Sequence, residues 1–233
     1  MSFPVVFPFR VLFSLGLSLG WYQSTPREET SVRPSTPELV FQEKMASVDS
    51  ASLPVVTLRM AETFLNTPYV AHTLEGNPTE QLVCRFDALD CTTLVDVAVA
   101  LAFARVHHLN YPGFLAVLRN LRYKNGEIDG YASRNHYFLE WRNQALSAGL
   151  LRDITFELGG EPYAKSIDFM SAHPALYSSM DSQEVLDAIK SNERLINETV
   201  YHAIPKADVG DVESRLLDGD IIGITSTYTT VWL

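Results

Sequence analysis

The chain has 233 residues, of which 46% are hydrophobic and 20% charged, and its mean hydropathy is +0.01. These values are typical of a globular protein, and the length favours one large domain with a short extension. The net charge of −10 disfavours nucleic-acid partners, because a surface of that sign repels phosphate backbones. Two cysteines, Cys84 and Cys91, are too few for a disulfide scaffold or a four-cysteine zinc site.

Residues 1–22 have the features of a signal peptide. The apolar run VLFSLGLSLGW at 11–21 follows Arg10 and is too short to span a bilayer comfortably. No later segment approaches the ~20 apolar residues of a membrane span. Because no Ala-x-Ala cleavage site follows the run, a disordered or interfacial tail is the alternative. The pattern predicts an exported, periplasmic protein without a stable membrane span.

The next segment is a predicted linker. Residues 24–38 read STPREETSVRPSTPE and are rich in Pro, Ser and Thr, a composition that cannot bury enough apolar surface to order itself. We therefore expect a disordered linker over 23–39 and one globular domain over 40–233.

Hydrophobic spacing predicts the elements of this domain in chain order. Residues 92–108 are apolar nearly all round, which is typical of a helix at the centre of a fold. Tyr111, Pro112 and Gly113 are expected to break that helix. Amphipathic spacing predicts further helices over 57–66, 114–121 and 135–148, and alternation predicts strands over 151–158, 196–204 and 219–226. Helices first and strands late indicate an α+β fold.

Cys91 stands immediately before the predicted central helix. Its sulfur would lie at the positive end of the helix dipole, where free backbone N–H groups stabilise a thiolate. A cysteine nucleophile requires that environment. The alternative is that Cys91 is a small buried hydrophobe, and Asp90 and Thr92 can cap the helix in either case.

Seven motifs occur in order along the chain. They are NTPYVAHTLEG at 66–76, LDCTTLVDVAVALA at 89–102, LRYKNGEIDGYASRNHYFLEW at 121–141, ITFELGG at 154–160, DFMSAHPALY at 168–177, IPK at 204–206 and LDGDIIGIT at 217–225. Together they resemble the bacterial family described as N-acetylmuramoyl-L-alanine amidase-like, a branch of the papain-like NlpC cell-wall cysteine hydrolases. The resemblance covers about residues 58–226, and it is specific because several unrelated motifs recur in one order.

The resemblance implies a papain-like α+β fold in which a central helix bearing the cysteine packs on an antiparallel sheet. It also implies cleavage of the amide between N-acetylmuramic acid and L-alanine in peptidoglycan fragments, with no metal or cofactor. Cys91 matches the family nucleophile, and Tyr69 matches a tyrosine that lies beside it and helps to hold the reacting carbonyl. The residues that match a substrate-cleft motif are Ser133, Arg134, His136 and Tyr137.

One part of the family pattern is not found. In the family, the histidine base follows the Gly-Asp-Ile-Ile strand, whereas here the chain reads YTTVWL after residue 227 and has no histidine after His202. We expect a C-terminally truncated domain that lacks part of its sheet, with 219–226 as an edge or unpaired strand. Such a chain is expected to be marginally folded and weakly active or inactive. The alternative is that another histidine serves as base, His136 being the best placed.

Two other hypotheses stay open at this point. The chain is a non-catalytic module that binds muropeptides but has lost the base, or it is a general exported α+β protein whose cysteine is structural. A disulfide between Cys84 and Cys91 would inactivate the nucleophile, but we expect Cys84 to fill an apolar gap instead.

Overall fold

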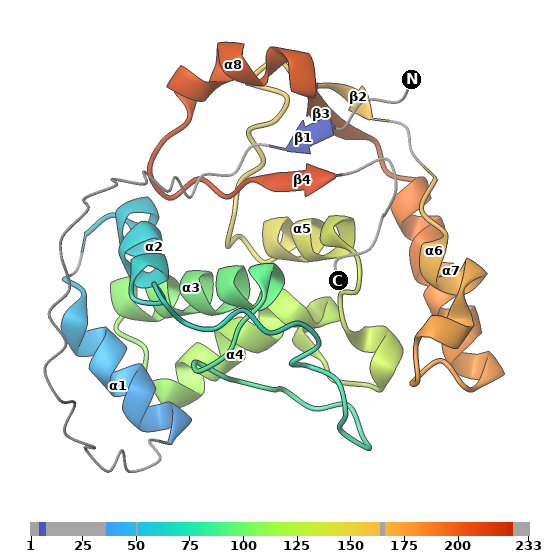
Figure 1. The fold of residues 1–233 in the computed structure, drawn as a ribbon, viewed down its shortest axis with the longest axis horizontal. Coiled ribbons are helices and arrows are strands. Elements are labelled where there is room, and N and C mark those ends of the chain that lie inside the picture. Colours follow the sequence, from blue (N-terminus) through green and yellow to red (C-terminus); the bar gives the residue numbers. More distant parts are fainter. Residues whose placement is uncertain (1–4, 8–35, 50, 164–165, 226–233) are drawn as a thin grey trace, which may run out of the picture.

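The computed structural model of the chain describes residues 5–7, 36–49, 51–163 and 166–225. It is a mixed α+β fold, in which a group of helices lies beside a small antiparallel sheet (Figure 1). The predicted α+β class is therefore confirmed. In the part of the chain that the structure describes, no helix has the length and apolar character to cross a membrane.

The predicted central helix is α3 (Cys91–Val106). It packs mainly against α2 (Leu53–Glu62) and α4 (Tyr111–Arg122), and α1 (Pro37–Ser47) contacts both α3 and α4. Most of its residues from Thr93 onward are buried, which explains the lack of a polar face in its sequence. The main hydrophobic core therefore forms around α3.

The domain begins earlier than predicted. Helix α1 starts at Pro37, inside the segment expected to be linker, because Thr36 caps it: the Thr36 hydroxyl accepts a hydrogen bond from the Leu39 N–H at 3.4 Å. Residues 23–35 lie outside the described ranges. Of the predicted signal peptide, the structure describes only Val5–Phe7, which form strand β1.

The predicted break between two helices is present, but it lies between Val106 and Tyr111, so the second helix starts three residues earlier than predicted. Tyr111, Pro112 and Gly113 are the first turn of α4, since the Asn110 side chain accepts a hydrogen bond from the Gly113 N–H at 3.1 Å and caps the helix. Proline is tolerated there because it lacks a backbone N–H, and the N–H groups of a first helical turn have no intrahelical acceptor. Helix α5 (Phe138–Ser147) is the predicted 135–148 helix, shortened at its start.

The sheet contains four described strands in the order β2-β3-β1-β4. They are β1 (Val5–Phe7), β2 (Glu161–Tyr163), β3 (Tyr201–Pro205) and β4 (Gly223–Thr225). Strand β1 is antiparallel to both β3 and β4, so it separates two strands that follow each other along the chain. Among the described strands, β4 lies at one end of the order; residue 226 of the predicted 219–226 strand lies outside the described ranges.

The strand predicted over 151–158 is wrong. There the chain forms a turn, in which Asp153 Oδ1 accepts a hydrogen bond from the Thr155 N–H at 2.8 Å and the Leu158 N–H donates to the Ile154 carbonyl at 3.0 Å. The predicted 196–204 strand begins only at Tyr201, because its first residues end α7 (Gln183–Asn197). The remaining short helices are α6 (Phe169–Ala172), α8 (Val209–Val212), η1 (Lys124–Gly126), η2 (Tyr131–Ser133), η3 (Pro174–Leu176), η4 (Lys206–Asp208) and η5 (Glu213–Arg215).

The helices and the sheet meet where β4 lies against α5 (Figure 1). A Cβ atom added to Gly223 would come within 2.6 Å of Phe138 Cζ, so a larger residue there would force the Phe138 ring to shift. The main core continues from α3 to Ala203 on β3 and to Ile221, just before β4. This contact brings the β4 segment to the same side of the domain as the start of α3.

Candidate active site

Cys91 is the first residue of α3, and its side chain is exposed. The helix is capped by Asp90, whose Oδ1 accepts a hydrogen bond from the Thr93 N–H at 2.8 Å. Thr93 Oγ1 accepts a hydrogen bond from the Asp90 N–H at 2.9 Å and completes a capping box. The cap therefore fixes the sulfur at the positive end of the helix while leaving it open to solvent.

Tyr69 lies beside Cys91. A short backbone bridge places it there, since the Val70 N–H donates to the Leu89 carbonyl at 3.0 Å and the Leu89 N–H donates to the Pro68 carbonyl at 3.2 Å. The Tyr69 side chain is 67% exposed. Partial burial, the negative charges of Cys91 and Asp90, and a hydrogen bond from its hydroxyl to Cys91 raise the pKa of Tyr69. The structure thus brings together the two residues that the sequence paired.

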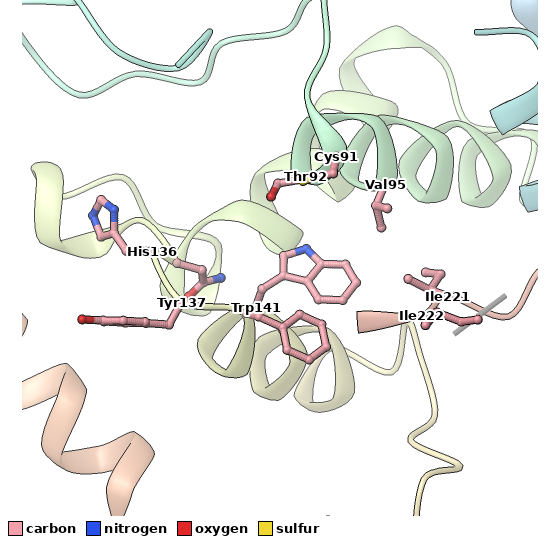
Figure 2. A pocket seen from close by; sticks show the side chains of 10 residues that line it. Cys91, Thr92, Val95, His136, Tyr137, Trp141, Ile221 and Ile222 are labelled. Carbon is pink, nitrogen blue, oxygen red and sulfur yellow. The ribbon is translucent and has the colours of Figure 1, made fainter. Parts of the chain in front are cut away.

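One side of this helix start opens into an apolar hollow of about 100 Å³. Figure 2 shows Cys91, Thr92 and Val95 along one wall, with Trp141 across from them and Ile221 beside them. The full lining is Cys91, Thr92, Val95, Asn135, His136, Tyr137, Phe138, Trp141, Ile221 and Ile222. Almost all of this surface is hydrocarbon, so the hollow suits a small apolar group.

A second hollow of about 100 Å³ adjoins the first at Thr92 and is called the polar hollow here, because more of its lining side chains are polar or charged. Its lining is His72, Thr73, Leu74, Glu75, Asp90, Thr92, Thr93, Arg134, Asn135 and His136. Thr92, Asn135 and His136 line both hollows, so the two meet at the start of α3. A ligand that bridges the hollows would therefore pass close to Cys91.

His136 lines both hollows, but its imidazole is engaged. Because a carbonyl only accepts, Nε2 must donate the 2.8 Å hydrogen bond to the Tyr131 carbonyl, which leaves Nδ1 as an acceptor. Burial, followed by the positive charge of Arg134, holds the pKa of His136 well below its usual value, so the ring is neutral at neutral pH. Figure 2 shows the ring away from Cys91, and within the described ranges no histidine forms a hydrogen bond with Cys91.

Arg134 lines the polar hollow but is committed to the protein. Its side chain is 4% exposed, Nη2 donates to Glu75 Oε1 at 2.6 Å, and Nη1 donates to the Leu74 carbonyl at 3.3 Å. Its Nε lies 3.8 Å from Glu80 Oε1. Arg134 therefore fastens the loop that carries Leu74 and Glu75, and it faces a ligand only as part of that ion pair.

The structure does not present the other two cleft candidates as polar ligand groups. Ser133 is absent from both linings, since its Oγ donates to the Gly130 carbonyl at 2.7 Å and closes a turn. Tyr137 lines the apolar hollow, but its hydroxyl donates to Glu193 Oε1 at 2.6 Å and accepts from the Met170 N–H at 2.9 Å. In Figure 2 that hydroxyl points away from Cys91. Both hydroxyls therefore have protein partners in this structure, and the expected contacts of Ser133 and Tyr137 with substrate stay predictions.

Sequence reasoning missed several lining residues. Asn135, Phe138 and Trp141 all line a hollow, but sequence analysis placed them only within a predicted helix over 135–148. Asn135 Oδ1 is buried without a hydrogen-bond partner in the described structure. Their one sequence signal is position, since all three lie within the NHYFLEW segment that contains His136.

The described residues hold no group of three or more His, Cys, Asp or Glu side chains that is arranged to bind a metal ion. The acidic and histidine side chains around the polar hollow are thus not assembled as a metal centre.

Comparison with protein families decides the family. The model of the AmiA-like family, described as N-acetylmuramoyl-L-alanine amidase-like, matches residues 59–231. The chain belongs to this family. Membership supports a peptidoglycan amidase-like function. No protein among the curated sequences matches the chain.

Several solved structures are also similar to this chain. An N-acetylmuramoyl-L-alanine amidase from Bacteroides uniformis is 36% identical over 78% of this chain and 77% of its own, with a TM-score of 0.73. A Bacteroides fragilis protein provisionally named a xylanase is 36% identical with a TM-score of 0.59, and the match covers 62% of this chain and 64% of that protein. A Legionella pneumophila protein that is 19% identical, with a TM-score of 0.55 over 81% of this chain and 77% of its own, shares the fold alone.

Proposed function

We propose that this amidase-like protein is a cysteine-dependent N-acetylmuramoyl-L-alanine amidase of the papain-like NlpC type that acts on muropeptides. The observation that carries the proposal is the exposed Cys91 at the first position of α3, which lines the apolar hollow and lies beside Tyr69. An exposed nucleophile at a helix start, next to space for a ligand, is an arrangement suited to acyl transfer.

The proposed reaction has two steps. The Cys91 thiolate attacks the lactyl carbonyl of N-acetylmuramic acid, the carbon–nitrogen bond breaks, and the L-alanyl amine leaves after gaining a proton. Water then hydrolyses the thioester, which releases the muramyl carboxylate and restores the thiol. Neither step needs a metal or a redox partner.

The negative charge that develops on the carbonyl oxygen needs donors. The backbone N–H groups of the first turn of α3 have no intrahelical acceptor, and Asp90 satisfies that of Thr93. We propose that the remaining N–H groups of this turn, together with the Tyr69 hydroxyl, hold the oxygen. Tyr69 is suited to this because it lies beside Cys91 and interacts with it electrostatically.

The reaction also needs a proton acceptor. Within the described ranges, His136 is the histidine that shares a hollow with Cys91, and its Nδ1 is an acceptor. Because the ring lies away from Cys91 and has a lowered pKa, we propose that proton transfer to it is inefficient and that turnover by this chain is slow.

The position of the His136 ring, away from Cys91, favours a second candidate function. A domain that keeps both hollows but has no histidine hydrogen-bonded to its cysteine, among the residues described, would bind muropeptides without cleaving them. Cys91→Ala would then leave the binding of muropeptides unchanged.

The proposed substrate fits the predicted export of the chain, because peptidoglycan lies outside the cytoplasmic membrane. We propose that residues 1–22 direct export to the periplasm and that the domain starts at α1. Removal of residues 1–22 would also remove β1 from between β3 and β4.

Mass spectrometry of a muramyl-L-alanyl peptide incubated with the chain tests the proposal. Release of the free L-alanyl peptide by the native chain, and not by Cys91→Ala, supports the amidase. The matched control is Cys84→Ala, since Cys84 lines neither hollow. Binding without release in the native chain and in Cys91→Ala would replace the amidase by the binding module.

A further inference from the structure

Trp141 forms the wall of the apolar hollow that faces Cys91 (Figure 2). It lies on α5, its side chain is only 6% exposed, and its ring stacks on Phe138 with centroids 6.0 Å apart. An indole enclosed in this way contributes a flat, rigid surface. The size of the hollow therefore depends on where this ring is held.

A buried ion pair holds the ring. Trp141 Nε1 donates to Asp96 Oδ1 at 2.7 Å, and Asp96 Oδ2 accepts from Arg122 Nε at 3.0 Å. The Asp96 and Arg122 side chains are 1% and 3% exposed, and Arg122 also donates to the Val83 carbonyl. Swinging the indole out of place would leave a buried carboxylate oxygen without this partner, which is costly. Asp96, which lies on α3, thus fixes the orientation of the indole ring.

The space that remains is small and hydrocarbon-lined. It measures about 100 Å³, and Val95, Ile221 and Ile222 form the walls beside Trp141. A closed apolar cavity of roughly 150 Å³ accepts benzene, so this smaller and partly open hollow matches a small aliphatic group more closely than an aromatic side chain. A polar or charged group would lose its water there without gaining partners.

We propose that Trp141 is a specificity-determining residue, positioned by Asp96, and that the apolar hollow takes the small aliphatic side chain of the residue next to the scissile amide. The inference rests on the proposed amidase function for its substrate, but not for the geometry of the hollow. It assigns Asp96 a role through Trp141, so Asp96 is a positioning residue. On this account the enzyme accepts alanine at that position and discriminates against phenylalanine.

Three variants and a matched control test the assignment in the full-length chain. Trp141→Phe shortens the wall and removes the indole N–H. Asp96→Leu removes the acceptor, whereas Asp96→Asn keeps one amide oxygen that can still accept from the indole. The control is Tyr201→Phe, which removes a hydroxyl that accepts a 2.8 Å hydrogen bond from Asn143 on the same helix but lines neither hollow.

The first readout is kcat/KM for a muramyl-L-alanyl peptide relative to the same compound with L-phenylalanine. We expect Trp141→Phe to lower the alanine preference at least tenfold, Asp96→Leu to act in the same direction, and Asp96→Asn to do so less. Tyr201→Phe is expected to leave the ratio unchanged even if it lowers the melting temperature. An unchanged ratio in Trp141→Phe overturns the assignment of specificity.

The second readout does not depend on turnover. Mass spectrometry follows the labelling of Cys91 by N-phenylmaleimide relative to iodoacetamide, a bulky apolar reagent against a small polar one. We expect Trp141→Phe and Asp96→Leu to raise this ratio at least fivefold and Tyr201→Phe to leave it unchanged. If the native chain releases no peptide, the proposed function fails, and the labelling ratio alone supports or overturns Trp141 as the wall of the hollow.

Discussion

The two cysteines of the chain lie seven residues apart and have opposite surroundings. Cys84 packs against the main core, and burial raises the pKa of its thiol to about 11, although Arg122 and a hydrogen bond with Tyr111 act in the other direction. Cys91 is exposed at the capped start of α3 and lines the apolar hollow. Both are free thiols, as expected for a Cys84 that fills an apolar gap. The comparison shows that a helix start and a ligand space distinguish a candidate nucleophile from a packing residue of the same type.

The largest effect expected from this comparison is on turnover. Cys91→Ala should lower the release of the L-alanyl peptide by at least about 1,000-fold, because no other thiol lies at the hollows. Cys84→Ala should change it by less than about threefold, since a buried structural thiol is inert. Initial rates measured by mass spectrometry compare the two variants, and circular dichroism checks that both are folded. Equal losses in the two variants would contradict the distinction.

The next effect is on labelling by iodoacetamide at pH 8. Because the pKa of Cys84 is about 11, only about one molecule in 1,000 carries its thiolate at that pH, and burial hinders access further. Cys91 should therefore be labelled at least about 100 times faster. Labelling of Cys84 should rise about tenfold for each pH unit up to its pKa, since only the thiolate reacts. Tryptic peptides separate the two sites, and similar rates at pH 8 would contradict the difference in environment.

A smaller effect is expected at Tyr69. Tyr69→Phe removes the hydroxyl that lies at Cys91 and should lower kcat about tenfold, less than a fully buried oxyanion donor would. The melting temperature should stay the same, because two thirds of the side chain is exposed. Steady-state kinetics alongside thermal unfolding separate the two quantities. A large loss of stability without loss of kcat would make Tyr69 a structural residue.

The smallest effect is on the helix that presents Cys91. Asp90→Ala removes the side chain that accepts from the Thr93 N–H and should lower the free energy of unfolding by about 1 kcal/mol. Asp90→Asn should cost less, because its amide oxygen can still cap the helix. Urea unfolding of both variants measures the difference. No loss in Asp90→Ala would mean that tertiary packing alone holds the start of α3.

The helical part of the fold was largely predictable from sequence. An apolar run behind Asp90 specifies α3, because both its burial and its cap are local properties of the chain. The first turn of α4 was misread, since proline and glycine at residues 112 and 113 break a helix in its interior but are compatible with its first turn. The sequence spacing could not tell these positions apart without the cap at Asn110.

The sheet and half of the site were not predictable in the same way. Strand β1 has three residues and pairs with segments about 200 positions away, so no local pattern identifies it. The proximity of Tyr69 and Cys91 followed from a family resemblance rather than from spacing. Trp141 and Asp96 looked like ordinary helix residues, because only the packing of α5 against α3 shows that the indole N–H meets a buried carboxylate.

The most direct test of the account is to trap the acyl-enzyme. The native chain is mixed with a muramyl-L-alanyl peptide, quenched in acid and digested. The mass of the proteolytic fragment that contains Cys91 is then measured by mass spectrometry. The account predicts a mass increase of one muramyl acyl group on that fragment, carried by no fragment of Cys91→Ala. Release of the L-alanyl peptide by Cys91→Ala at the native rate would contradict it.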